Sequence, residues 1–190
     1  MKGAVIAVVV VLLVVGIGIG GKLVSIRNEL VMQREAITGQ WSQVDVALRR
    51  RADLIPNLVE TVRGFAKQEQ EVFGRIADAR SRLLSARTPQ ESIQANNALD
   101  SAIGRLLVIS ENYPQLRSND NFIRLQDELA GTENRIAVER RKYNESVQKY
   151  NTSIELFPNN VAAGLFGFTR SDAYFRTEGT AREVPKVKFD

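Results

Sequence analysis

Hydrophobic residues recur every three or four positions from residue 23 to residue 157, which is the spacing of helices rather than of strands. The pattern is clearest between residues 119 and 156, where large apolar side chains stand at intervals of seven. A repeat of seven is what coiled-coil-like packing requires, so one long helix with a buried seam is predicted here. The seam consists of Phe122, Leu129, Ile136, Tyr143, Tyr150 and Phe157, with Leu125, Thr132, Val147 and Ile154 beside it.

Proline and capping signals divide the preceding chain into three further helices. The first is predicted to continue from the N-terminal segment to about Arg51. Pro56 has no N–H and disfavours helix at the residue before it, so we expect a turn between antiparallel helices there, the alternative being a kink in one long rod. A second helix is predicted over residues 58–86. Thr88-Pro89-Gln90-Glu91 is a capping box with proline at the first helical position, which predicts a third helix ending before Tyr113-Pro114.

Four helices joined by short connections are expected to lie antiparallel to their neighbours. The predicted fold class is therefore all-α, an antiparallel, up-and-down bundle of long helices. We expect three parts: a transmembrane anchor over residues 1–22, the helical bundle over residues 23–157, and an irregular, aromatic C-terminal tail over residues 158–190.

The C-terminal tail is rich in aromatic residues, whereas disordered segments are poor in them, so we expect it to pack on something. The simpler interpretation is docking along the flank of the bundle. The alternative is that residues 164–168 insert into a neighbouring subunit or into the membrane interface. The aromatic residues of the tail are Phe166, Phe168, Tyr174, Phe175 and Phe189.

Nineteen uncharged residues, Gly3 to Gly21, stand between Lys2 and Lys22. As a helix they span ~29 Å, enough to cross the hydrocarbon core of a bilayer. We predict a single-pass membrane anchor. The alternative is a cleaved signal peptide, because glycines near the end of the run supply small residues, although the run exceeds the ~7–15 residues of a typical signal h-region.

The side of the membrane that the bundle faces stays open. Lys22, Arg27 and Arg34 follow the span and favour a cytoplasmic bundle by the positive-inside rule. A very short N-terminus before a long apolar run is also typical of an export signal-anchor, which places the bundle outside. The chain has no cysteine, which fits either compartment.

Most catalytic chemistry is excluded by composition. The chain has no histidine and no cysteine, hence no imidazole base, no Ser-His-Asp triad, no thiolate nucleophile and no His- or Cys-bound metal. Glu residues that could meet inside the bundle lack the Glu-x-x-His motif of di-iron proteins. We predict no cofactor and no enzymatic activity. The net charge is only +4, and Arg49–Arg51 is the sole basic cluster, so nucleic-acid binding is not expected.

Several polar and aromatic residues lie close to the apolar seams. The simplest interpretation of each is structural: a register-fixing contact, a helix cap or a satisfied core amide. Tyr143-Asn144 recurs seven residues later as Tyr150-Asn151. The candidate structural or interaction residues are Trp41, Arg50, Asp53, Pro56, Asn57, Glu133, Asn134, Arg135, Tyr143, Asn144, Tyr150, Asn151, Phe157, Pro158, Phe166 and Phe168.

Through these residues the chain resembles the LemA family of bacterial membrane proteins, in the same order, from about Leu30 to Phe168. The resemblance implies a helical-bundle domain on a single-pass anchor in the bacterial cell membrane, with no established enzymatic activity. It also implies association with membrane proteases or membrane-organising systems.

The function expected is that of a membrane-anchored helical scaffold that self-associates. The alternative is an adaptor or regulator of a membrane protease or another membrane complex. The expected partners are the lipid bilayer, further copies of the chain, and a membrane protease or other membrane protein.

Overall fold

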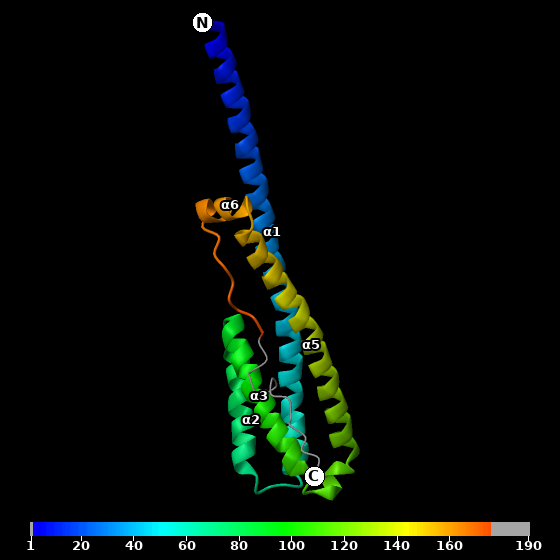
Figure 1. Ribbon diagram of the computed structural model, residues 1–190. Coiled ribbons are helices and arrows are strands. Elements are labelled where there is room, and N and C mark those ends of the chain that lie inside the picture. Colours follow the sequence, from blue (N-terminus) through cyan, green and yellow to red (C-terminus); the bar gives the residue numbers. More distant parts are fainter. Residues whose placement is uncertain (1, 176–190) are drawn as a thin grey trace, which may run out of the picture. The chain divides into compact units, whose positions relative to one another are not determined.

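The computed structural model describes residues 2–175 (Figure 1). All regular elements in this range are helices, so the predicted all-α fold class is confirmed. The helices are α1 Lys2–Arg63, α2 Gln70–Ser85, α3 Pro89–Ser110, α4 Pro114–Arg117, α5 Asp120–Glu155 and α6 Asn159–Phe166.

The chain forms two compact units, each with its own packing. Among the described residues, unit 1 contains residues 2–47 and 134–172, and unit 2 contains residues 48–133 and 173–175. Unit 1 therefore holds the first part of α1, the second part of α5, and α6. Unit 2 holds the end of α1, then α2, α3, α4 and the beginning of α5.

The expected turn at Pro56 is wrong, because α1 continues through this proline to Arg63. A proline inside a helix leaves the carbonyl four residues earlier without its usual N–H donor, here the carbonyl of Ala52. Arg80 of α2 replaces that donor, with Nε 2.8 Å from the Ala52 oxygen. Pro56 itself is exposed.

The predicted second helix over residues 58–86 is also corrected, because the chain leaves the helix after Arg63 and re-enters it at Gln70. The backbone N–H groups of Gly64 and Ala66 donate to the carbonyls of Glu60 and Val62, which closes the end of α1. The break therefore falls several residues later than the proline that was expected to cause it.

Unit 2 is built from antiparallel helices. The guanidinium of Arg63 lies 5.2 Å from the centre of the Phe73 ring, while Arg80, further along α2, reaches back to Ala52. Thus α2 runs along α1 in the opposite direction. The capping box is confirmed at the start of α3, where the Glu91 N–H donates to Thr88 Oγ1 at 3.2 Å. The core includes Leu48, Ile55, Leu58, Val62, Phe73, Ile76, Leu99, Leu106, Phe122 and Leu129.

In unit 1, α5 packs antiparallel to α1. The rings of Trp41 and Tyr143 meet edge to face at 5.3 Å, and Gln33 Nε2 donates to Ser153 Oγ at 3.0 Å. Gln33 precedes Trp41 on α1, whereas its partner Ser153 follows Tyr143 on α5, so the two helices run in opposite directions. The seam at intervals of seven is buried from Phe122 to Tyr150 over both units.

The last position of the predicted seam differs from the prediction. α5 ends at Glu155, and Phe157 is 82% exposed. The segment beyond it is not irregular throughout, because Asn159–Phe166 forms α6. Gly167 ends this helix with φ of 73°, a conformation that favours glycine, and the Phe168 N–H returns to the Ala163 carbonyl at 2.9 Å. Residues 176–190, including Phe189, lie outside the described residues.

Candidate functional site

The beginning of α1 presents its apolar side chains to the surroundings. From Ile6 to Ile19, the large hydrophobic side chains are 49 to 74% exposed. The most apolar window of eighteen residues has a mean hydropathy of 2.6, and none of it is buried. By length and composition this helix can cross a membrane, and within residues 2–175 it alone meets that test.

Directly after this apolar run, α6 packs on α1. Ala162 and Ala163 of α6 form a buried cluster with Ile26 and Leu30 of α1, and Leu23, Ile154 and Phe168 pack against it. Two alanines at the contact let the helices approach closely. In Figure 1, α6 lies across α1 rather than along it.

Two cation–π contacts hold the aromatic residues around the end of α6. The guanidinium of Arg27 lies 5.8 Å from the centre of the Phe166 ring, and that of Arg34 lies 5.6 Å from the centre of the Phe168 ring. Such contacts stabilise by ~0.5–1 kcal/mol each at exposed sites. The candidate residues Phe166 and Phe168 therefore lie against Arg27 and Arg34 of α1.

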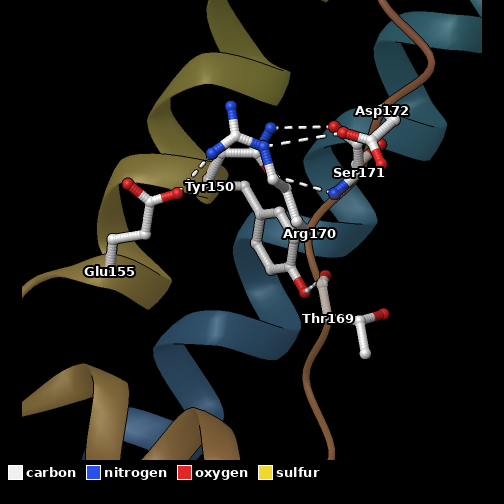
Figure 2. A network of polar contacts seen from close by, with 7 residues as sticks. Tyr150, Glu155, Thr169, Arg170, Ser171 and Asp172 are labelled. Carbon is white, nitrogen blue, oxygen red and sulfur yellow. Dashed lines mark hydrogen bonds and ion pairs between the residues drawn. The ribbon is translucent and has the colours of Figure 1, made fainter.

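The segment after α6 is tied to α5 by two neighbouring candidate residues, Tyr150, which Figure 2 labels, and Asn151. The Tyr150 hydroxyl donates to the Thr169 carbonyl at 2.9 Å. The Asn151 amide donates to the Ser171 carbonyl at 2.8 Å and accepts from the Ser171 N–H at 2.9 Å. Because Asn151 is buried and satisfies both backbone groups of one residue, it holds the tail in a single register.

An ionic contact accompanies this attachment. Arg170 pairs with Glu155 near the end of α5 and, through Nε, with Asp172 at 3.5 Å (Figure 2). These groups are exposed, so each pair contributes at most ~1 kcal/mol. Burial raises the pKa of Tyr150, although the positive charge of Arg34 acts in the opposite direction.

A second polar cluster lies in unit 2 around Arg51. Its Nη1 atom pairs with Asp100 of α3, lies 2.7 Å from Glu133 Oε2 of α5, and is 3.4 Å from Asn96 Oδ1. The Arg51 side chain is only 8% exposed, whereas Asp100 and Glu133 keep 35% and 44% of their side-chain surface. One buried guanidinium therefore joins three helices and is neutralised by two half-exposed carboxylates.

The sequence pattern indicated Glu133 of this cluster, but it indicated Arg50 rather than Arg51. Arg50 is exposed and Arg51 is buried. The signal that identifies Arg51 is its spacing, because it continues the series of Leu30, Ile37 and Val44 at intervals of seven. Nothing in the sequence marks its partners Asn96 and Asp100, which lie on another helix.

The other candidate residues divide into two groups. Trp41 and Tyr143 meet where α1 and α5 pack, with Tyr143 fully buried, and the next residue, Asn144, is half-buried. A second group is exposed, and the structure does not bring its members together into a site. These residues are Arg50, Asp53, Pro56, Asn57, Asn134, Arg135, Phe157 and Pro158.

The polar contacts described above hold helices and the tail together. Arg51 pairs with side chains of two other helices, and Tyr150 and Asn151 bond to the backbone of the segment after α6. Within the part of the chain that the structure describes, no group of three Asp and Glu side chains is placed to hold a metal ion. The features that remain are an exposed apolar helix, an antiparallel helical bundle and a tail fastened to it.

These features define a helical-bundle protein whose first helix begins as a candidate membrane span. The LemA family model matches residues 40–189, and the chain belongs to the LemA family.

Three relatives show a similar extent of match. The chain is 26% identical to magnetosome protein MamQ 1 of Paramagnetospirillum magneticum, over 84% of this chain and 68% of that protein. It is 27% identical to magnetosome protein MamQ of Magnetospirillum gryphiswaldense, with the same coverage. It is 25% identical to protein LemA of Metamycoplasma hominis, over 86% of this chain and 73% of that protein.

Proposed function

We propose that this protein is a single-pass, membrane-anchored helical scaffold that self-associates and catalyses no reaction. The observation that carries the proposal is the continuity of α1. The exposed apolar run between Lys2 and Lys22 passes without interruption into the part of α1 that packs on α5 and α6. Its partners in this proposal are the lipid bilayer and further copies of the chain, and not nucleic acid.

Continuity of the helix has a mechanical consequence within unit 1. A flexible linker would let a bundle reorient freely beside the membrane, whereas a helix transmits the orientation of the span to whatever packs on it. Trp41 and Tyr143 then lie ~30 Å along α1 from Gly21, at 1.5 Å per residue. A bundle held in this way suits a scaffold that presents its surface at a defined height above the bilayer.

Support for self-association comes from the glycines of the span. Gly16 and Gly20 stand one helical turn apart, and a Cβ atom added at either position would meet nothing within 4 Å. Small residues at a spacing of four let transmembrane helices approach closely and associate. Among the described residues of unit 1, none covers these two glycines, so a second copy of the span can pack against them.

The decisive experiment is light scattering coupled to size-exclusion chromatography of the full-length protein in detergent. The expected result is a mass of more than one chain, which falls in a Gly16→Leu/Gly20→Leu variant. The matched control is Val11→Leu/Val15→Leu, which enlarges a different face of the same helix and is expected to leave the mass unchanged.

A monomeric wild-type protein in this measurement would contradict the scaffold and favour the alternative, an adaptor or regulator of a membrane protease or another membrane complex. Extraction of the protein from membranes by alkaline carbonate, without detergent, would contradict the anchor itself.

A further inference from the structure

We propose that α6, with the two residues that precede its Pro158, is an interfacial helix that inserts an apolar face into the same bilayer that α1 crosses. The proposal rests on the proposed anchoring by α1 and adds a second, shallower membrane contact to it. The residues that carry it are Leu156, Phe157, Val161 and Leu165.

α6 lies beside the part of α1 that follows the apolar run. α6 packs against Leu23, Ile26 and Leu30, which follow the last residue of the apolar run, Gly21. At 1.5 Å per residue, Leu23, Ile26 and Leu30 lie ~3, ~8 and ~14 Å beyond Gly21 along α1. The headgroup layer on each side of the hydrocarbon core is about 5–8 Å thick. The contact of α6 with α1 therefore starts within the headgroup layer, where amphipathic helices lie in a membrane, and extends beyond it on the side away from the hydrocarbon core.

One face of α6 is left uncovered. Val161 and Leu165 are spaced by four, so they share one side of α6, and they are 57 and 68% exposed; Phe157, in the turn before α6, is 82% exposed. The opposite side is buried through Ala162 and Ala163. No charged residue occurs in α6. A contiguous exposed apolar patch of this kind marks an interaction surface.

The direction of α6 relative to α1 also suits a membrane surface. Figure 1 shows α6 crossing α1, so when α1 spans the bilayer, α6 lies along its surface. The cations nearest on α1 are Lys22 and Arg27, and the Arg27 guanidinium lies 5.8 Å from the centre of the Phe166 ring. Basic side chains at this level match the phosphate groups of lipid headgroups.

A second copy of the chain fits the patch less well. The patch consists of four exposed side chains, whereas a stable protein interface engages about 20–30 residues and buries ~800 Å² on each partner. A bilayer needs no complementary shape and, given the anchor, lies beside α6. The role that follows is to fix the height and tilt of the span, because α6 is packed on α1 through Ala162 and Ala163.

The test uses spin labels at single cysteines, which the cysteine-free chain permits without other substitutions. The full-length protein is placed at one copy per nanodisc of phosphatidylcholine and phosphatidylglycerol. Labels are introduced as Leu165→Cys on α6, Leu12→Cys in the span, and Val138→Cys on α5. Collision rates are measured with oxygen, which concentrates in lipid, and with a water-soluble nickel chelate.

The expected result is lipid-like accessibility at Leu12, weaker but still lipid-like accessibility at Leu165, and water-like accessibility at Val138. Val138 is the matched control, because it is an exposed valine and lies further from α6 along α5 than Tyr143 does. Circular dichroism checks that each labelled protein keeps its helicity.

Three outcomes would overturn the proposal in different ways. A water-like label at Leu165 beside a lipid-like label at Leu12 removes the interfacial helix and leaves the anchor intact. Water-like labels at both positions remove the anchor as well. Protection of Leu165 only in discs that hold two copies would assign the patch to a second chain instead.

Discussion

Arg80 of α2 donates from Nε to the Ala52 carbonyl at 2.8 Å, the carbonyl that Pro56 leaves without a donor in α1. A side chain from the neighbouring helix thus takes the place of a missing backbone N–H. This contact explains why a proline in the interior of α1 neither turns nor ends the helix.

Arg80→Met is expected to lower the free energy of unfolding by about 1–2 kcal/mol, because the Ala52 carbonyl loses a charged donor. In a Pro56→Ala background, residue 56 regains its N–H and the same substitution is expected to cost ~1 kcal/mol less. Thermal unfolding by circular dichroism of the four proteins in detergent measures this coupling. Arg82→Met, on the exposed side of α2, is the control. Equal costs in the two backgrounds would contradict the compensation.

In the Arg51 cluster, we expect the free energy of unfolding to fall more when the two carboxylates are neutralised than when the arginine is replaced. In Asp100→Asn/Glu133→Gln the buried guanidinium has no counter-charge and cannot lose its proton, so the free energy of unfolding falls by ~3–5 kcal/mol. Arg51→Met removes the arginine partner of two buried atoms, Asp100 Oδ1 and Glu133 Oε2, but the two side chains keep 35 and 44% of their surface in contact with water, so a loss of about 1–3 kcal/mol is expected. Urea unfolding compares the two variants. A larger loss for Arg51→Met would show that packing of the arginine, not its charge, dominates.

Ile136 lies fully buried at the middle of the α5 seam. Ile136→Asp places an unpaired carboxylate in the core and is expected to cost more than ~4 kcal/mol. Val138→Asp, two residues further on an exposed side, is the control and is expected to stay within ~0.5 kcal/mol of the wild type. Melting curves followed by circular dichroism distinguish them. An Ile136→Asp protein that melts within a few degrees of the wild type would contradict the core assignment.

Asn151 is expected to control the attachment of the tail. Asn151→Ala removes both hydrogen bonds to Ser171, so hydrogen exchange at the Ser171 amide should accelerate about tenfold for each ~1.4 kcal/mol lost. Asn151→Asp keeps an acceptor for the Ser171 N–H and is expected to accelerate exchange less. Exchange at Ala47, in the core of α1, is the internal reference. Unchanged exchange at Ser171 in Asn151→Ala would mean that Phe168 and Tyr150 suffice to hold the tail.

The pH dependence of stability is expected to report on Tyr150. Burial raises the pKa of Tyr150 in the folded protein. The neutral phenol therefore contributes fully to the free energy of unfolding below the usual pKa of about 10, and this contribution is lost as the pH rises through the pKa of the folded protein. Tyr150→Phe has no ionisable group there, so its melting temperature should fall less between about pH 9 and pH 12. The comparison is made as a difference from the wild type, since other tyrosines titrate as well. Parallel curves would contradict the shift.

Periodicity alone accounts for much of the fold. The series from Phe122 to Tyr150 predicts α5 and its buried side, because hydrophobic side chains at intervals of seven can leave water only by packing on one side of a helix. The capping box at Thr88 predicts the start of α3, because its contacts are local. The apolar run before Lys22 likewise predicts a candidate span from length and composition.

Contacts between distant segments decide the rest. Pro56 stays within α1 because Arg80, on another helix, satisfies the carbonyl that the proline leaves free. Arg51 is buried because Asp100 and Glu133 meet it from two other helices.

Contacts between distant segments also decide where the tail lies. α6 and the segment after it are placed by Asn151 and by the small residues that meet Ile26 and Leu30. A local pattern determines which face of a helix avoids water, because that depends on neighbours within a turn or two. Only the tertiary structure determines which polar group supplies a missing partner, because that partner is distant along the chain and becomes a neighbour only on folding.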